Sequence, residues 1–277
     1  MKKILQTIAR IPLFILVIIV LLPLVYTLTN SFMNMNEIIR YYGNLKTYTP
    51  FHIVPDQFSL IGYYGVLIRH PHFLTAFWNS LLIVVPIVLG QLFFSALAGY
   101  SFTYFNFKLR NVLFFLVIIL MMMPYQVTLV SNYIVLDKLN LIGGYQSIII
   151  PGLFSAFGVF LLRMIIESIP RETIEAARID GASHFKILWK IVIPNCRAGV
   201  ASLVVLSFID CWNMVEQPLV YLEDSSMYPL SIYLTEVSQR DYPLGFAGGM
   251  IAMIPVLLLF FFFEDELVSG ISATNLR

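Results

Sequence analysis

The chain has 277 residues, of which 59% are hydrophobic and only 12% are charged, and its mean hydropathy is +0.83. Soluble domains carry about 25% charged residues, so this composition excludes a soluble enzyme, a disordered chain and a nucleic-acid-binding protein. The net charge of +1, from 17 basic and 16 acidic residues, gives no global basic field for a polyanion. The two cysteines, Cys196 and Cys211, form neither a disulfide framework nor a metal-binding spacing. The composition therefore indicates a polytopic α-helical membrane protein.

Six apolar runs along the chain are long enough to cross a membrane, since a spanning helix needs about 20 mostly apolar residues. The runs cover roughly residues 11–32, 76–102, 112–136, 145–166, 199–220 and 244–263. No small-residue cleavage site follows the first run, so it is a span rather than a cleaved signal peptide. Prolines at positions 23, 86, 124, 151 and 255 lie inside the runs, where neighbouring helices can satisfy the carbonyls that they free. We expect one all-α transmembrane domain over residues 1–277.

The distribution of Lys and Arg predicts which side each connection faces, because cytoplasmic connections carry an excess of positive charge. Twelve of these residues lie in the two termini, the connection between spans two and three, and the stretch between spans four and five, whereas five lie elsewhere. We therefore expect both termini on the cytoplasmic side of the cell membrane. The long connection of residues 33–75 then faces outside, and its aromatic residues argue against disorder: Tyr41, Tyr42, Tyr48, Phe51, Phe58, Tyr63 and Tyr64.

The stretch between the fourth and fifth spans, residues 168–194, has the pattern of two short helices around a turn. Asp180-Gly181 is a turn signal, because glycine can take the left-handed conformation that ends a helix. Ser183 can cap the helix that follows, and Pro194 is expected to close the segment. The apolar residues of the second helix share one face: Phe185, Leu188 and Val192.

Two interpretations fit this segment. It can be an amphipathic helix that lies on the inner leaflet, or an element that docks into a groove of another protein. Ala176 and Ala177 stand beside the charge of Glu175 and close to the turn. Small side chains there permit a close approach of two backbones, which favours docking.

These residues resemble the cytoplasmic "EAA" signature of ABC importer permeases: Glu175-Ala176-Ala177, then Asp180-Gly181-Ala182, then Ile193-Pro194. Other motifs are similar to the maltose-type carbohydrate-uptake branch: Asn79-Ser80-Leu81, Ala98-Gly99-Tyr100, Met123-Pro124, Leu139-Asn140-Leu141 with Gly144-Tyr145, Trp212-Asn213 and Pro218-Leu219. The resemblance covers nearly the whole chain. The sequence departs from the family pattern at Met214, at Ala198 and in the tail, where Glu264-Asp265-Glu266 and later Ser272-Ala273-Thr274-Asn275 stand.

The resemblance implies a transport subunit rather than an enzyme. The chain has no Gly-x-x-x-x-Gly-Lys-Ser/Thr phosphate loop, so its energy would come from a cytoplasmic ATPase dimer that binds ATP and Mg²⁺, and the chain would bind no cofactor itself. A homologous second permease chain would pair with it in the lipid bilayer. An extracellular solute-binding protein would deliver a sugar to the outer connections, including residues 34–75 and 222–243.

The resemblance also assigns residues 168–194 as the coupling segment that docks on the ATPase. Its docking residues would be Glu175, Ala176, Ala177, Arg178, Asp180, Gly181, Ala182, Ser183, Phe185 and Pro194. Glu175 would contact basic or backbone groups, the two alanines would allow close packing, and Gly181 would supply the turn. Asp180 would cap the helix or pair with Arg178.

Polar and aromatic side chains within the spans are candidates for the substrate pathway, because unsatisfied polar groups in lipid are costly. They are Gln91, Gln126, Asn132, Phe154, Phe157, Asp210, Trp212, Asn213 and Glu216. The alternative role of the polar residues is hydrogen bonding between helices, and that of the aromatic residues is packing or an interfacial belt. The four histidines have no partners at a metal-binding spacing, so no metal site is predicted.

The leading hypothesis is therefore a permease subunit that imports a di- or oligosaccharide. Import of another solute, such as glycerol phosphate, through the same architecture is the alternative. A membrane-embedded enzyme is disfavoured because the polar residues are scattered. A secondary transporter is disfavoured because we find no clear internal repeat.

Overall fold

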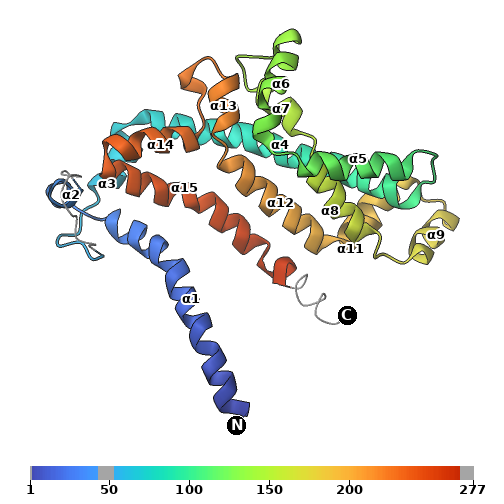
Figure 1. Ribbon diagram of the computed structural model, residues 1–277, viewed down its shortest axis with the longest axis horizontal. Coiled ribbons are helices and arrows are strands. Elements are labelled where there is room, and N and C mark those ends of the chain that lie inside the picture. The colour runs from blue at the N-terminus through green and yellow to red at the C-terminus, as the bar shows by residue number, and fades with distance from the viewer. Residues whose placement is uncertain (1, 43–52, 269–277) are drawn as a thin grey trace. The chain divides into compact units, whose positions relative to one another are not determined.

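The computed structural model describes residues 2–42 and 53–268 (Figure 1). Within these ranges the regular structure is helical, and the pairing of extended backbone is limited to an isolated bridge between Met33 and Phe58. The all-α prediction is confirmed. Residues outside the described ranges include Tyr48, Phe51, Ser272, Ala273, Thr274 and Asn275. The chain splits into two compact units, Met1–Phe77 with Ile232–Ile254 and Trp78–Ser231 with Pro255–Arg277.

The first unit contains the N-terminal helix and the connection that follows it. Its helices are α1 (Lys2–Asn30), α2 (Met35–Tyr42), α3 (Ile61–Tyr64) and the π-helix η1 (Gly65–Arg69), with the larger parts of α14 (Leu230–Arg240) and α15 (Tyr242–Phe262). Glu37 on α2 is buried and accepts the backbone N–H of Asp56 at 2.6 Å. The ring of Phe32 stacks on that of Phe58, with centroids 4.7 Å apart. The described part of the 33–75 connection is thus held against the end of α1, as its aromatic content predicts.

The second unit holds most of α4 (Pro71–Tyr104) and the middle of the chain. Its other elements are α5 (Arg110–Met122), α6 (Tyr125–Lys138), α7 (Gln146–Gly152), α8 (Ala156–Ile166), α9 (Arg171–Ile179), α10 (His184–Ile187), the π-helix η2 (Leu188–Val192), α11 (Ile193–Asn195), α12 (Arg197–Trp212), α13 (Glu216–Tyr221) and the 3₁₀-helix η3 (Ser225–Met227). Helix α8 packs against both α5 and α12. All of the sequence-predicted pathway and docking residues belong to this unit.

Some apolar runs form a single helix of membrane-spanning length, and others form two helices joined at a bend. Four stretches are long and apolar enough on their own: Arg10–Asn30, Pro71–Tyr104, Gln146–Ile166 and Tyr242–Phe262. Two further stretches are bent pairs, Arg110–Met122 with Tyr125–Lys138 at 106° and His184–Asn195 with Arg197–Trp212 at 85°. Counting each bent pair as one span gives up to six spans in the described part of the chain, the number predicted. The fifth differs in its bounds, because α12 ends at Trp212 and the predicted remainder to residue 220 lies in the separate α13.

Prolines in the runs have different effects on the helices. Pro23, Pro86 and Pro255 lie inside α1, α4 and α15, as expected for helices in a bundle. Pro124 instead separates α5 from α6, and Met123 before it is extended, with φ −72° and ψ 125°. A proline disfavours the helical conformation of the residue before it, so the predicted third span is a broken helix rather than a continuous one.

Helices α4 and α8 touch through their backbones at Gly99. A Cβ added to Gly99 would lie 3.0 Å from the backbone nitrogen of Arg163 and 3.3 Å from the carbonyl carbon of Leu162. Further along the same contact, a Cβ on Gly158 would collide with Ser95 Oγ. Small residues at helix contacts let backbones approach closely in membranes. The glycine of the Ala98-Gly99-Tyr100 motif therefore has a packing role.

Buried Asn79 fixes the chain segment that follows α13. Its side-chain nitrogen donates to the carbonyls of Ser226 at 2.8 Å and Tyr228 at 3.1 Å, and its oxygen accepts the hydroxyl of Tyr145 at 2.8 Å. The backbone N–H of Ser226 also donates to Asp224 Oδ1 and holds the pKa of that carboxyl below its usual range. The Asn79-Ser80-Leu81 motif thus links α4 to the connections before α7 and after α13.

Gly99→Ala tests the contact between α4 and α8. The rigid backbone of Arg163 cannot rotate away from the new methyl group, so we expect a loss of about 1–3 kcal/mol in the free energy of unfolding, the usual cost of overpacking. Gly249→Ala on α15 is the matched control, because the nearest atom there is the methyl carbon of Thr27 at 3.9 Å. Thermal unfolding of the solubilised chain should show a lower Tm for the first variant only. Equal Tm values would contradict the close approach.

Asn79→Leu tests the polar link. The variant keeps the side-chain size but removes the partner of the half-buried Tyr145 hydroxyl and of the carbonyls of Ser226 and Tyr228, and the loss of such hydrogen bonds costs about 0.5–1.5 kcal/mol each. Asn195→Leu is the control, because the exposed Asn195 amide donates only to the carbonyl of Ile191 on its own helical turn. Thermal unfolding should separate the two variants by several degrees, and an unchanged Tm for Asn79→Leu would show that the link carries no stability.

Candidate functional site

The segment of residues 168–194 forms two helices around a turn, as predicted. Helix α9 ends in a Schellman motif, because Gly181 N–H donates to the carbonyl of Arg178 and Ala182 N–H donates to the carbonyl of Ala177, both at 3.0 Å. Gly181 has φ +81°, in the left-handed region that favours glycine. The Ser183 side chain then accepts the backbone N–H of Lys186 at 3.4 Å and caps α10. The turn geometry is therefore built into the sequence.

The second helix of the segment runs slightly further than expected. It continues from α10 through the π-helix η2 into α11, which ends at Asn195, one residue beyond Pro194. Pro194 lies near the end of this helical stretch, in the short α11. The chain then bends by 85° into α12.

The inner face of the segment belongs to a hydrophobic core that it shares with α4 and α8. Its buried members are Ala96, Tyr100, Leu162, Ile166, Ile174, Ala177, Ile187, Leu188, Val192, Cys196 and Leu203. A polar contact joins the same elements, since Tyr100 Oη and His184 Nδ1 lie 2.9 Å apart. The His184 ring also packs edge-on against Phe105, with centroids 4.8 Å apart. The segment is thus packed firmly onto the helices behind it.

Most of the predicted docking residues form the outer face. The exposed ones are Glu175, Ala176, Arg178, Asp180, Gly181, Ser183, Phe185 and Pro194, and Ala182 is half-buried. Ala177 differs from the expectation that both alanines face a partner, because it is 9% exposed and packs in the core with Ile174. Residues three apart share one side of a helix, so Ile174 and Ala177 both turn inward while Ala176 turns outward.

The structure adds one residue that the sequence reasoning missed. Ile179, at the end of α9, is 86% exposed, the largest exposed fraction among the described large hydrophobic residues. It lies five residues after Ile174 and therefore off the buried face, which is the signal that could have found it. Phe185 on the other side of the turn is 60% exposed and packs loosely on Trp189, with ring centroids 6.1 Å apart. Two apolar side chains therefore project beside the turn.

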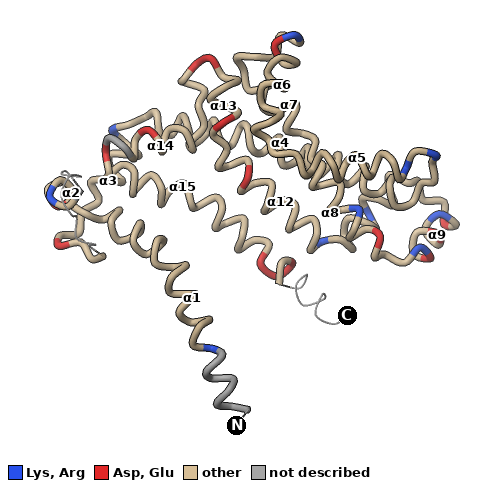
Figure 2. The backbone as a smooth tube through the Cα atoms, in the orientation of Figure 1, with Lys and Arg blue, Asp and Glu red and all other residues tan. Residues whose placement is uncertain are grey.

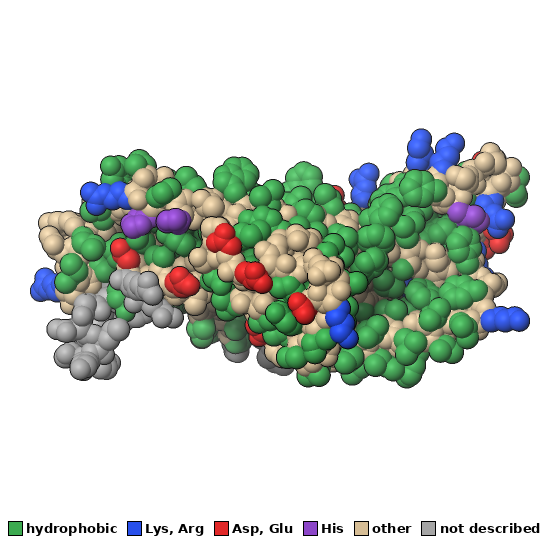
Figure 3. All heavy atoms as spheres, turned by 90° about the horizontal axis from the view of Figure 1, so that it is seen from above, with side chains coloured by type: hydrophobic (Ala, Val, Ile, Leu, Met, Phe, Trp, Pro, Cys, Tyr) green, Lys and Arg blue, Asp and Glu red, His purple; other side chains and the backbone are tan. Residues whose placement is uncertain are grey.

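The same segment carries exposed charged side chains. Lys and Arg side chains gather at the end of the second unit that carries α9 (Figure 3). The exposed basic residues of the segment are Arg171, Arg178, Lys186 and Lys190, and the exposed acidic residues are Glu172, Glu175 and Asp180. Exposed apolar side chains among exposed charges make this segment a candidate contact surface.

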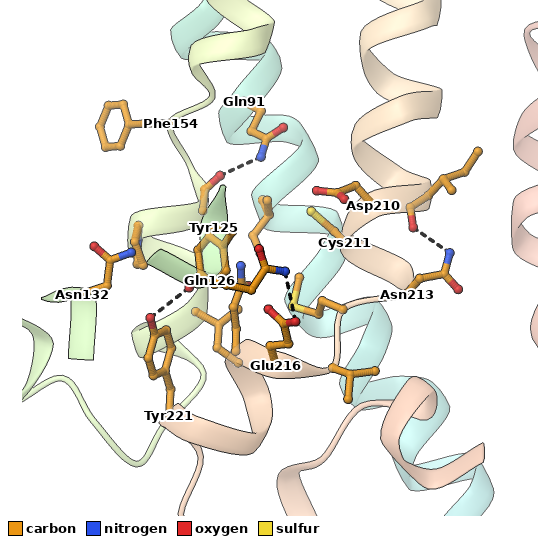
Figure 4. Close-up of a pocket in the computed structure, with 18 residues that line it drawn as sticks. Gln91, Tyr125, Gln126, Asn132, Phe154, Asp210, Cys211, Asn213, Glu216 and Tyr221 are labelled. Atoms are coloured by element: carbon orange, nitrogen blue, oxygen red, sulfur yellow. Dashed lines mark hydrogen bonds between the residues drawn. The ribbon is translucent and has the colours of Figure 1, made fainter. Parts of the chain in front are cut away.

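A second candidate site is a cavity of about 670 Å³ between α4, α6, α7, α12 and α13 (Figure 4). Three interruptions of the helices meet there: Pro124 with Tyr125, Gly152 to Phe154, and Asn213 to Val215. Irregular backbone is tolerated at membrane depth where it lines a cavity or is buried in protein. The broken helices and the cavity therefore belong together.

The cavity collects most of the predicted pathway residues. Its lining includes Gln91, Gln126, Asn132, Phe154, Asp210, Asn213 and Glu216. Phe157 and Trp212 are not among the lining residues, and Trp212 is buried with its ring stacked on Phe208 at 5.3 Å. Trp212 precedes the break at Asn213 and packs inside the unit, which the sequence pattern could not distinguish from a position facing the cavity.

Hydrogen bonds inside the cavity show which groups have partners within the chain. Gln126 Nε2 donates to Glu216 Oε1 at 3.1 Å, and Gln91 Nε2 donates to the Gly152 carbonyl at 3.0 Å. The hydroxyls of Tyr125 and Tyr221 lie 2.9 Å apart, and Figure 4 marks this hydrogen bond with a dashed line. The sequence reasoning missed both tyrosines, although the position of Tyr125 directly after Met123-Pro124 was a signal. The cavity presents amides, carboxylates and phenol groups to its interior.

A family model matches the part of the chain that carries most of both candidate sites. Residues 91–272 match the family model described as "Binding-protein-dependent transport system inner membrane component". This range contains the whole docking segment and nearly all of the cavity lining. The matched family is a membrane permease component rather than an enzyme.

Individual relatives match over most of their length. The chain is 29% identical to the arabinooligosaccharides transport system permease protein AraQ of Halalkalibacterium halodurans over 262 residues, which are 94% of this chain and 92% of the relative. It is 31% identical to the sn-glycerol-3-phosphate transport system permease protein UgpE of Yersinia pestis over 198 residues, which are 70% of each chain.

A solved structure shares the fold. It is the crystal structure of a bacterial ABC transporter involved in the import of the acidic polysaccharide alginate, with a TM-score of 0.82 at 22% identity, covering 95% of this chain and 96% of that chain. The resemblance to ABC importer permeases is confirmed. The chain belongs to the family of inner membrane components of binding-protein-dependent transport systems.

Proposed function

We propose that this chain is the permease subunit of an ATP-driven importer that carries a di- or oligosaccharide across the cell membrane. The observation that carries the proposal is the 670 Å³ cavity at the meeting point of three helix breaks. A sugar presents hydroxyl groups at its edges and C–H groups on its faces. The cavity offers the matching amides and carboxylates for the first and the rings of Tyr125, Phe154 and Tyr221 for the second.

The names of the relatives support this class of cargo. AraQ is named for arabinooligosaccharides and matches over most of both chains. UgpE is named for glycerol 3-phosphate and represents the alternative cargo. The cavity favours the sugar, because Lys and Arg are absent from its lining in the described part of the chain, whereas recognition of a phosphate commonly uses these residues.

In the proposed mechanism, the segment of residues 168–194 docks in a cleft of a cytoplasmic ATPase dimer. Ile179 and Phe185 would enter the cleft, and Glu175 would contact basic or backbone groups of its wall. Closure of the dimer on ATP and Mg²⁺ would move the segment as a rigid body, because its core is continuous with α4 and α8. Helix α4 carries Gln91, and Phe154 lies just before α8. A movement of the segment would therefore be passed directly to the cavity wall.

The proposed assembly contains two further proteins besides the ATPase. A homologous permease chain would complete the pathway, and an extracellular solute-binding protein would deliver the sugar. The excess of Lys and Arg places both termini and the docking segment on the cytoplasmic side in this proposal. Exposed apolar side chains on α5, including Val112, Phe115 and Leu120, would then face lipid or the second permease.

Glu175→Lys and Gly181→Asp test the docking role. The first reverses a charge on the outer face, and the second adds a side chain and a charge at φ +81°, where glycine is favoured. Both variants should insert into the membrane and lose ATP-driven uptake by at least about tenfold, the effect of losing roughly 1.4 kcal/mol of coupling. Asp137→Lys is the control, because it reverses an exposed charge at the end of α6, outside the segment and outside residues 34–75 and 222–243. Wild-type uptake rates for both docking variants with the same ATPase would refute the assignment.

Ile179→Ser tests whether the apolar tip inserts into the partner. Burial of an isoleucine side chain contributes about 1.5–3 kcal/mol, so its loss should weaken co-purification of the ATPase by roughly tenfold or more. Leu139→Ser is the matched control, because Leu139 is also an exposed apolar residue at a helix end, at 60% exposure. An ATPase affinity that is equally unchanged by both substitutions would remove Ile179 from the interface.

A further inference from the structure

We infer that the cavity is a charge filter, in which Asp210 and Glu216 admit neutral or cationic solutes and reject anionic ones. The inference rests on the proposed transport function and narrows its cargo class. Both carboxylates are exposed side chains of residues that line the cavity. Asp210 lies in the last turn of α12 and Glu216 begins α13, so they flank the same helix break.

The carboxylates have no cationic partner in the cavity lining. Among the described residues that line it, the charged side chains are Asp210 and Glu216 alone. The partner of Glu216 is the neutral amide of Gln126, at 3.1 Å. A neutral donor orients the carboxylate without cancelling its charge, so the cavity keeps two uncompensated negative groups.

The positive charge of the second unit lies elsewhere. Figure 2 marks acidic positions on α12 and α13, and basic positions at the ends of α5, α6 and α8, at the start of α12 and around α9. None of these basic residues is in the cavity lining. A separate hollow of about 420 Å³ is lined by Asn106, Phe107, Lys108, Arg110 and Asn111 and has the opposite sign. These two hollows in the described part of the chain differ in the sign of their charge, which provides an internal comparison.

Walls of low dielectric strengthen such a field. A cleft lined by one sign of charge changes the local concentration of charged solutes by a factor of about ten or more. Two carboxylates beside a solute-sized volume therefore suffice to separate a neutral sugar from a sugar acid or a phosphate ester. The fold itself does not set this preference, because the transporter that shares it imports the acidic polysaccharide alginate. The preference must come from the lining side chains.

The filter can be measured without knowing the cargo. Asn213→Cys places a thiol on an exposed lining position of the acidic cavity, and Asn111→Cys places one in the basic hollow. Each full-length variant, in complex with its transporter partners in lipid nanodiscs, is labelled with methanethiosulfonates that are positive, neutral or negative. Labelling of the unsubstituted chain gives the background, which includes any labelling of Cys211, a buried residue that also lines the cavity. Rates are divided by those of a free thiol in solution.

We expect the positive-to-negative rate ratio to be about tenfold or more higher at Asn213→Cys than at Asn111→Cys. Adding Asp210→Asn and Glu216→Gln should bring the ratio at Asn213→Cys close to one and leave the ratio at Asn111→Cys unchanged. A ratio that does not respond to these two neutral variants would overturn the inference. Failure of the neutral reagent to reach Asn213→Cys would also overturn it, because the cavity would then be closed to solutes.

Uptake measurements separate this inference from the proposed function. One outcome is ATP-dependent uptake of arabinotriose into proteoliposomes together with a labelling ratio that does not change when the carboxylates are neutralised. That outcome would overturn the charge filter and leave the proposed import function standing. A labelling ratio that follows the carboxylates, in a complex that hydrolyses ATP without importing any neutral oligosaccharide tested, would support the filter and count against sugar import.

Discussion

The structure of the second unit depends on one constraint: backbone N–H and C=O groups within a bilayer must find partners inside the protein. Three helix breaks interrupt the regular pattern, and side chains bond to freed carbonyls at two of them. Gln91 donates to the Gly152 carbonyl and Ser231 to the Met214 carbonyl. Because those hydrogen bonds need polar side chains, the region becomes a polar cavity. The cavity is thus a consequence of the breaks as much as a place for cargo.

The same reasoning explains why motif residues far apart in sequence have separate physical roles. Gly99 allows α4 and α8 to touch, Asn79 holds the connection after α13, and Gly181 supplies a left-handed turn. Each role needs a particular residue type, because a Cβ, an apolar side chain or a right-handed backbone would not fit. None of the three contacts the cavity, so they support the site by positioning its walls.

The sequence carried some of these features and not others, for physical reasons. Hydropathy predicted the spans, and Asp180-Gly181 predicted the turn, because both are local properties. Pro86 and Pro124 stand in equally apolar runs, yet one lies inside a helix and the other ends one, since the outcome depends on neighbouring helices. Ala176 and Ala177 are identical in composition, and the shared core decides that Ala177 turns inward. Contacts between helices that are far apart in the sequence cannot be predicted from local patterns in a single sequence.

Helix α4 connects the two candidate sites and limits how they can act on each other. Tyr100 contacts His184 of the docking segment, and Gln91 lines the cavity nine residues earlier, about 13 Å away along the helix. The backbone contact at Gly99 fixes α8 to the same helix. A displacement of the segment would therefore carry α4 and α8 together. The cavity would change shape only if α6 and α13 moved less than α4 and α8. The helix breaks at Pro124 and Asn213 are the points where the backbone permits such relative movement.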